Sequence, residues 1–129
     1  MKKRNKMKIL KYLLLFLLML TSAGIKAQQD TLKLKRQARA LLRQGNELYK
    51  KQKFTDASVA YRKALSKNSK YKKGSYNLGN AFYQEKNYKE AVPQYELTAN
   101  TAQDKITTAE AYHNIGNAIM YQKQSPTAV

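Results

Sequence analysis

The chain repeats itself at an interval of 34 residues, and this period restricts the folds that it can adopt. Residues 43–65 align with residues 77–99 at this offset, and a shorter third copy begins near Ala111 with an offset of 37. Self-similarity at 20 to 50 residues is typical of proteins built from stacked supersecondary units. The sequence therefore predicts one array of similar units.

Small and aromatic residues occupy the shared columns. The small columns are Gly45, Gly79 and Gly116, then Ala57, Ala91 and Ala128, and the aromatic column is Tyr61 and Tyr95. Apolar residues recur at helical spacing on both sides of a short polar segment, which predicts two helices in each unit. We expect each glycine to face an alanine of the second helix, so that close packing offsets the cost of about 1 kcal/mol of glycine in a helix.

Candidate N-cap residues are present at the start of three predicted helices. Asn87 with Glu90 and Thr107 with Glu110 have the spacing of a capping box, in which each side chain bonds a free backbone amide of the first turn. Thr55 is the corresponding N-cap candidate in the first unit.

The columns G-N-x-[LF]-Y and then [FY]-x-x-A-x-x-x-Y resemble the tetratricopeptide repeat over residues 38 to about 105, and in part over 109–129. The resemblance implies an all-α fold, a right-handed α-solenoid of antiparallel helix pairs with about two and a half units at 38–71, 72–105 and 109–129. It also implies a binding scaffold with a concave inner face, not a catalyst.

A narrower resemblance concerns the order of the segments. A secretory signal followed by RQGNELYKKQKF, YNLGNAFY and AYHNIGNA is similar to the exported tetratricopeptide protein of bacterial aerotolerance (Bat) operons. This implies a periplasmic protein in an envelope complex linked to aerotolerance or stress, beside membrane proteins with von Willebrand A-type domains and a MoxR-type ATPase.

Residues 1–27 have the order of a secretory signal peptide. Six basic residues precede an apolar run from Tyr12 to Leu20, and small residues lead to Ala27. The run is short for a bilayer core of about 30 Å, so we expect export to the periplasm and cleavage after Ala27; a retained membrane anchor is the alternative. Residues 28–37 form a basic lead-in to the first helix.

Positive charge is concentrated in one half of the chain. Residues 28–75 hold 14 basic and three acidic side chains, whereas residues 76–129 hold four and five. An exported protein rarely meets nucleic acid, so we expect no nucleic acid partner; the basic half indicates anionic lipid, acidic polysaccharide or an acidic protein. A solvated helical surface with no dedicated ligand is the alternative.

The first helices of stacked pairs line the inner face of such an array, which gives the candidate partner-binding residues. They are Leu42, Asn46, Tyr49, Lys50, Lys73, Tyr76, Asn77, Asn80, Tyr83, His113, Asn117 and Met120. Amides can donate to and accept from a passing backbone while rings contact side chains, which suits an extended peptide, and the two lysines favour an acidic one. The asparagine column has a structural interpretation as well.

Some tetratricopeptide domains hold a C-terminal carboxylate with lysine and asparagine. Asn46 and Asn77 match the amide half of that pattern, but Leu42 and Glu110 stand where lysines are needed, so no such clamp is expected. The chain has no cysteine and one histidine, His113. We therefore predict no catalytic residues, metal or cofactor. The rival to a scaffold is a basic protein that associates with anionic membrane or polysaccharide without specific peptide recognition.

The last five residues, SPTAV, have the pattern of a helix start, and Ala128 follows Gly116 by the same 12 residues that separate Gly45 from Ala57. We interpret the chain as a fragment of a longer array, with a natural terminus as the alternative. The helix at 109–124 would then be half of a repeat with one apolar side exposed, and self-association through it is predicted.

Overall fold

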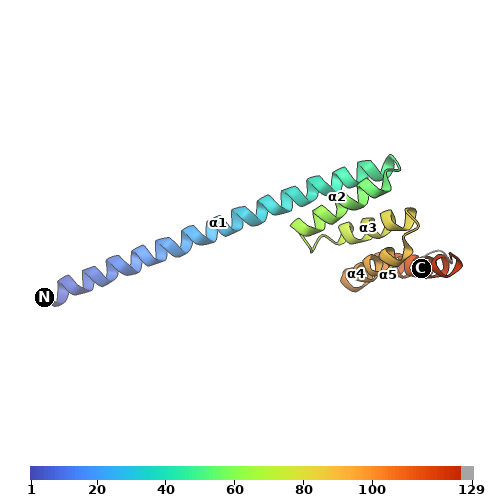
Figure 1. Ribbon diagram of the computed structural model, residues 1–129. Coiled ribbons are helices and arrows are strands. Elements are labelled where there is room, and N and C mark those ends of the chain that lie inside the picture. Colours follow the sequence, from blue (N-terminus) through green and yellow to red (C-terminus); the bar gives the residue numbers. More distant parts are fainter. Residues whose placement is uncertain (126–129) are drawn as a thin grey trace. The chain divides into compact units, whose positions relative to one another are not determined.

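The computed structural model describes residues 1–125, without the side chains of residues 21–23 and 72. Within residues 1–125 the chain forms five helices and no strand, so the predicted all-α fold is confirmed. The helices are α1 (Lys2–Lys50), α2 (Phe54–Lys67), α3 (Lys72–Gln84), α4 (Tyr88–Thr101) and α5 (Lys105–Gln124) (Figure 1). Ala128 of the alanine column lies outside the described residues.

Two compact units divide the chain between Leu34 and Lys35. In the first unit, residues 2–34 form one uninterrupted helical segment of α1, and each side chain described there is exposed. Among the described residues, α1 is the one helix with the length and apolar composition to cross a membrane, and a secretory signal near an N-terminus meets the same criterion. The predicted lead-in at residues 28–37 is helical like its neighbours.

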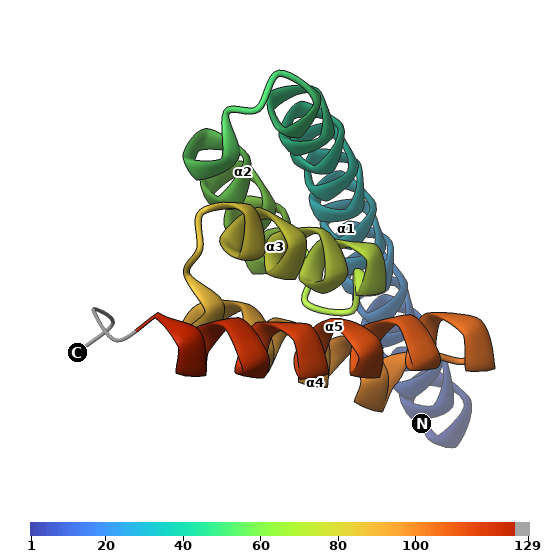
Figure 2. The same cartoon turned by 90° about the vertical axis from the view of Figure 1, so that its right-hand side faces the viewer.

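The second unit is a stack of antiparallel helix pairs. Residues 35–50 of α1 pair with α2, and α3 pairs with α4, while α5 packs against α4 (Figure 2). Each first helix also contacts the next: the Nδ2 of Asn77 donates to Asn46 at 3.0 Å, and that of Asn114 donates to Tyr76 at 3.2 Å. These bonds fix the register of successive pairs.

Alanine and aromatic side chains fill the core of the second unit. Its buried members are Leu42, Ala57, Tyr61, Ala64, Leu78, Ala81, Phe82, Ala91 and Tyr95. Phe82 also stacks beneath the guanidinium of Arg62, whose Cζ lies 5.3 Å from the ring centroid. The small residues let the helices approach, and the rings occupy the space that remains.

The glycines of the repeat face tyrosine rings. A Cβ added to Gly45 would lie 2.5 Å from Cε1 of Tyr61, and one added to Gly79 would lie 2.8 Å from Cε1 of Tyr95. The sequence interpretation named alanine as the facing residue, and this was wrong: the nearest atoms belong to the tyrosine one turn after each alanine. The absent side chain of each glycine makes room for a tyrosine ring. A contact between the glycine backbone and an alanine would not require that room.

In both hairpins a residue of positive φ lies two residues after the end of the first helix. Gln52 and Lys86 each have φ of 58°. In each hairpin a backbone amide just beyond the helix bonds back into it: Lys53 donates to the carbonyl of Leu48, and Asn87 donates to that of Phe82, both at 2.9 Å. This is the Schellman geometry of a helix end, here with residues other than glycine in the left-handed position.

The three predicted capping motifs are not formed. Thr55 lies inside α2, and Asn87 occupies the N-cap position of α4 without a side-chain bond. In α5 the cap is Asp104, whose carboxylate accepts from the backbone amide of Thr107 at 2.7 Å. Asp104 has the extended backbone that capping requires, with ψ of 147°, whereas the tight turn leaves Asn87 with ψ of 66°.

Candidate partner-binding face

A hollow of about 300 Å³ lies between the first helices of the two hairpins. We call this cavity the first hollow. Its lining residues are Arg43, Asn46, Glu47, Tyr49, Lys50, Tyr61, Asn77 and Asn80. Four of them, Arg43, Asn46, Glu47 and Lys50, come from one side of α1 because they are three, four and seven residues apart. The asparagines of α3 form the opposite wall.

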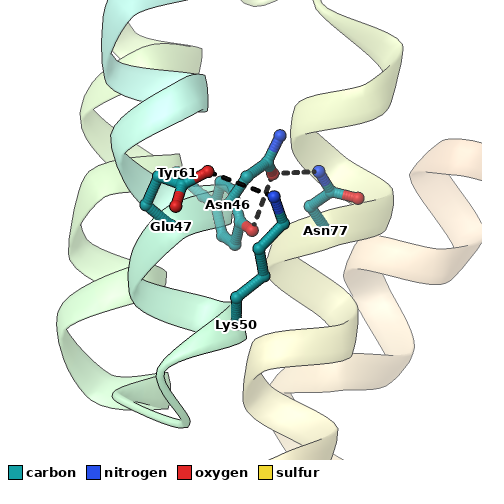
Figure 3. A network of polar contacts seen from close by, with 5 residues as sticks. All are labelled: Asn46, Glu47, Lys50, Tyr61 and Asn77. Carbon is teal, nitrogen blue, oxygen red and sulfur yellow. Dashed lines mark hydrogen bonds and ion pairs between the residues drawn. The ribbon is translucent and has the colours of Figure 1, made fainter.

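Asn46 lies at the centre of a hydrogen-bond network in the first hollow (Figure 3). Its Oδ1 accepts from the hydroxyl of Tyr61 at 2.9 Å and from the Nδ2 of Asn77 at 3.0 Å. Both acceptor positions of the amide oxygen are therefore occupied. The Nδ2 of Asn46 has no partner among the described residues and is left to donate to a ligand.

Asn80 is held in the same way in the second hairpin. Its Oδ1 accepts from the hydroxyl of Tyr95 at 2.8 Å. Burial raises the pKa of Tyr61 to about 12, and it raises the pKa of Tyr95 as well, so both hydroxyls keep their protons at neutral pH. Each hydroxyl is thus a fixed donor, and it orients the asparagine so that the amide N–H groups face away from it.

The charged groups of the first hollow are mostly cationic. Lys50 lies 3.1 Å from the carboxylate of Glu47, and both side chains are well exposed. Arg43 makes no ion pair with any described residue. Because an exposed pair contributes about 1 kcal/mol or less, Lys50 can leave Glu47 for a ligand at small cost. The hollow therefore offers N–H donors and positive charge to a ligand rich in acceptors.

A second hollow shares Asn77 with the first. It is lined by Lys73, Tyr76, Asn77, Ala102, Gln103, Asp104, Thr107 and Glu110. Its charges are one lysine against two carboxylates. Hydrogen bonds to the Thr107 backbone lower the pKa of Asp104, so that this carboxylate is ionised at neutral pH. The two hollows thus differ in charge along one face.

The predicted binding residues separate into groups. Asn46, Tyr49, Lys50, Asn77 and Asn80 line the first hollow, and Lys73, Tyr76 and Asn77 line the second. Leu42 is different: it is buried in the core, 7% exposed, where it is not available to a ligand. Its apolar side chain completes the packing between the first helices.

The other predicted residues lie away from both hollows. Tyr83 makes edge contacts with Tyr88 and Tyr121, at centroid distances of 5.2 and 6.1 Å. On α5, the Nδ2 of Asn117 lies 3.0 Å from Nε2 of His113, and Met120 is exposed. The asparagine column is regular in the sequence, but its members do not form one site in the structure.

The comparison with family models decides what kind of array this is. The model of the tetratricopeptide repeat matches residues 36–105, which is more than half of the chain. The chain belongs to the tetratricopeptide repeat family. Among solved structures it is similar to the N-terminal domain of stress-induced protein-1 (STI-1) from C. elegans, with a TM-score of 0.65, 26% identity, and coverage of 70% of this chain and 74% of that one. The search of curated proteins finds no match.

Tetratricopeptide domains are typically protein-interaction scaffolds. Within the part of the chain that the structure describes, no three histidine, aspartate or glutamate residues are grouped so that they could hold a metal ion. Leu42 is buried and Glu110 lines the second hollow, at the two positions where a carboxylate clamp would need lysines.

Sequence reasoning missed several lining residues of this tetratricopeptide face. Arg43 and Glu47 had a signal in the sequence, because Arg43 precedes Asn46 and Glu47 precedes Lys50 by three residues, so that they share one side of the helix. Asp104 and Gln103 lie in the connection before α5, where helical periodicity gives no indication of direction.

Proposed function

We propose that this tetratricopeptide protein is a non-catalytic scaffold that binds an extended, acidic segment of a protein partner in the first hollow. The observation that carries the proposal is the occupancy of the asparagine oxygens: tyrosine hydroxyls at 2.9 and 2.8 Å take the acceptors of Asn46 and Asn80. An extended segment presents free backbone carbonyls, and its carboxylates add acceptors with negative charge.

Arg43 and Lys50 supply the charge complement. Both belong to the exposed side of α1 that lines the first hollow. Hydrogen bonds to charged groups contribute about 1.5 to 3 kcal/mol, roughly twice the value of neutral ones. A segment with a carboxylate near Arg43 and backbone carbonyls near Asn46 and Asn80 would bind the amide and guanidinium donors that have no partner among the described residues.

The test uses a matched pair of charge reversals. A capped, fluorescently labelled peptide of alternating glutamate and threonine is titrated into the full chain, and binding is followed by anisotropy. Arg43→Glu places a carboxylate in the hollow, whereas Lys63→Glu makes the same change of charge on the exposed side of α2, outside both hollows. We expect Arg43→Glu to weaken binding about tenfold or more and Lys63→Glu by about twofold.

The rival function makes a different forecast for the same pair. A basic surface that binds anionic membrane or polysaccharide responds to net charge, so the two reversals would weaken binding equally. Such binding would also be lost above a few hundred millimolar salt, since the Debye length falls to about 3 Å at 1 M. Equal effects of the two reversals would replace the scaffold with the surface-associating protein.

The cellular setting is part of the proposal. Export to the periplasm rests on the order of charge, apolar run and small residues before Ala27, and the aerotolerance complex with von Willebrand A-type membrane proteins rests on the resemblance to the Bat operon protein. A fusion to alkaline phosphatase, which folds to an active form only after export, tests the first point. N-terminal sequencing of the mature protein should begin at Gln28, and a start at Met1 would favour the retained anchor.

A further inference from the structure

The hydrogen bonds around Asn77 give the two hollows opposite polarity. The Oδ1 of Asn46 accepts from the hydroxyl of Tyr61 at 2.9 Å, and Asn77 directs its Nδ2 to the same oxygen at 3.0 Å. The Oδ1 of Asn77 therefore points away from Asn46 (Figure 3), and it has no hydrogen bond to any described residue. Because Asn77 lines both cavities, the first hollow receives amide donors and the second receives an amide acceptor.

The carboxylates of the second hollow strengthen this difference. Asp104 and Glu110 line a cavity of about 370 Å³, and neither makes an ion pair with a residue that the structure describes. Asp104 caps α5, but a carboxylate accepts about four hydrogen bonds and so keeps acceptor capacity. The cation in the lining, Lys73, is exposed and its ammonium can turn into the solvent. The second hollow therefore suits a ligand group with positive charge and several donors.

An aromatic ring in the lining narrows the choice of cation. Tyr76 is held by an edge contact with Tyr95, at a centroid distance of 5.9 Å, and by the Nδ2 of Asn114, which donates to its hydroxyl at 3.2 Å. A guanidinium is planar, stacks on aromatic rings and has five N–H donors, whereas an ammonium has three and no flat face. A fixed ring beside carboxylates and an amide oxygen therefore favours arginine over lysine.

We infer that the second hollow binds an arginine side chain of the same extended segment whose acidic part occupies the first hollow. The inference rests on the proposed function and adds the order of charges in the partner. In an extended segment every second side chain points to the same side, about 7 Å from the next. Since the hollows adjoin at Asn77, the acidic residue and the arginine are separated by an even number of positions.

Labelled peptides test this charge order by anisotropy with the full chain. The reference is the capped peptide of alternating glutamate and threonine. Two further peptides carry arginine in place of two glutamates, at one end or at the other, so that both directions of binding are covered, and lysine versions of both are the controls. We expect one arginine peptide to bind about tenfold more tightly than the reference, and its lysine version to bind at least threefold more weakly than the arginine peptide.

The net charge of the protein works against this result. The chain carries +17, and arginine makes the peptide less negative, so attraction to the overall charge would favour the reference peptide. Tighter binding of an arginine peptide would therefore come from a local contact.

Glu110→Gln locates that contact, with Glu96→Gln as the matched control. Glu96 is exposed on α4 and lines neither hollow, so its replacement makes the same change of net charge elsewhere. Glu110→Gln should weaken the arginine peptide about fivefold and tighten the reference peptide about twofold, because a carboxylate attracts the first and repels the second. Glu96→Gln should leave the ratio of the two affinities unchanged. Circular dichroism checks that both variants keep their helicity.

Three results would overturn the inference while the proposed function stands. They are arginine peptides that bind no more tightly than the reference, lysine peptides that bind as well as the arginine peptides, and equal effects of Glu110→Gln and Glu96→Gln. In each case the reference peptide would still bind and would still respond to Arg43→Glu. Absence of binding by every peptide would overturn both proposals.

Discussion

A buried phenol controls the polar interior of each hairpin. Tyr61 and Tyr95 are held against glycine, and their hydroxyls fix the amides of Asn46 and Asn80. Ring position, protonation and asparagine orientation therefore depend on one another. A change at any of these residues should affect both stability and the donors presented in the first hollow.

Alkaline pH should expose this dependence. The pKa of Tyr61 is about 12 in the folded chain against 10.0 when unfolded, so its contribution is complete below pH 10 and is lost as pH rises toward 12. We expect the free energy of unfolding to decrease by up to about 2 kcal/mol over this range. Tyr61→Phe should cost about 1 kcal/mol at neutral pH and remove the Tyr61 share of the alkaline decrease while the share of Tyr95 remains, as measured by urea unfolding.

The repeat glycines should respond with opposite signs to the same substitution. Gly79→Ala forces a methyl group into the ring of Tyr95, so the free energy of unfolding should fall by about 1 to 2 kcal/mol, overpacking outweighing the better helix propensity. Gly116→Ala meets no atom and should raise it by about 0.5 to 1 kcal/mol. Thermal melts of both variants measure these changes. A lower melting temperature for both variants would contradict the prediction.

The sequence identified the glycine columns but not what they face. Columns give spacing along each helix, and the same spacing places an alanine or the tyrosine one turn later opposite the glycine. Which of the two fills the gap depends on rotamers and on the acceptor at Asn46 or Asn80. The structural interpretation of the asparagine column, which the sequence left open, holds for these two residues.

The helix ends show where prediction from local sequence patterns fails. The capping boxes at Asn87 and Thr107 had the right spacing, but capping requires an extended N-cap backbone, and the turn before α4 prevents it. That turn is set by Lys86 in the left-handed region, a feature with no signal in the sequence because the residue is not glycine.

Lys86→Gly should stabilise the second hairpin. A residue with a Cβ in the left-handed region costs roughly 1 kcal/mol that glycine avoids, and part of this gain is lost to the freedom of glycine in the unfolded chain. We expect the free energy of unfolding to rise by about 0.5 kcal/mol in urea titrations. Lys89→Gly, inside α4, is the contrasting control and should lower it.

The cap of α5 should make this helix sensitive to acid. The pKa of Asp104 is lowered mainly by its bond to the backbone amide of Thr107, so its contribution is present above pH 3.8 and is lost as pH falls below that value. We expect the Asp104→Asn variant to lose less helicity at low pH than the unmodified protein, as measured by circular dichroism. Glu96→Gln, an exposed carboxylate without such a bond, should leave the acid transition unchanged.

At the scale of the molecule, the repeat predicted the array, and composition predicted a separate N-terminal segment. The compact second unit begins at Lys35, close to residue 38, where the resemblance to the tetratricopeptide repeat begins. The continuity of α1 through the basic lead-in was not foreseen, because basic residues at 28–37 carry no apolar side to reveal a helix.

Removal of residues 1–27 should leave the stability of the array unchanged. The described side chains of residues 1–34 are all exposed and add nothing to the core, which lies wholly within the second unit. We expect residues 28–129 to unfold with the urea midpoint and slope of the full chain, since the slope follows the surface exposed on unfolding. A lower midpoint would show that the N-terminal segment supports the fold.

The phenol and the amide that bond in each hairpin are 15 residues apart in both. A hairpin thus brings its own internal polar contact wherever it is inserted, and Asn77 brings the bond to the preceding pair. Tandem duplication of the gene segment for residues 72–105 would lengthen the protein without any compensating substitution, whereas an insertion of another length would separate donor from acceptor. Growth by whole hairpins therefore preserves both polar contacts.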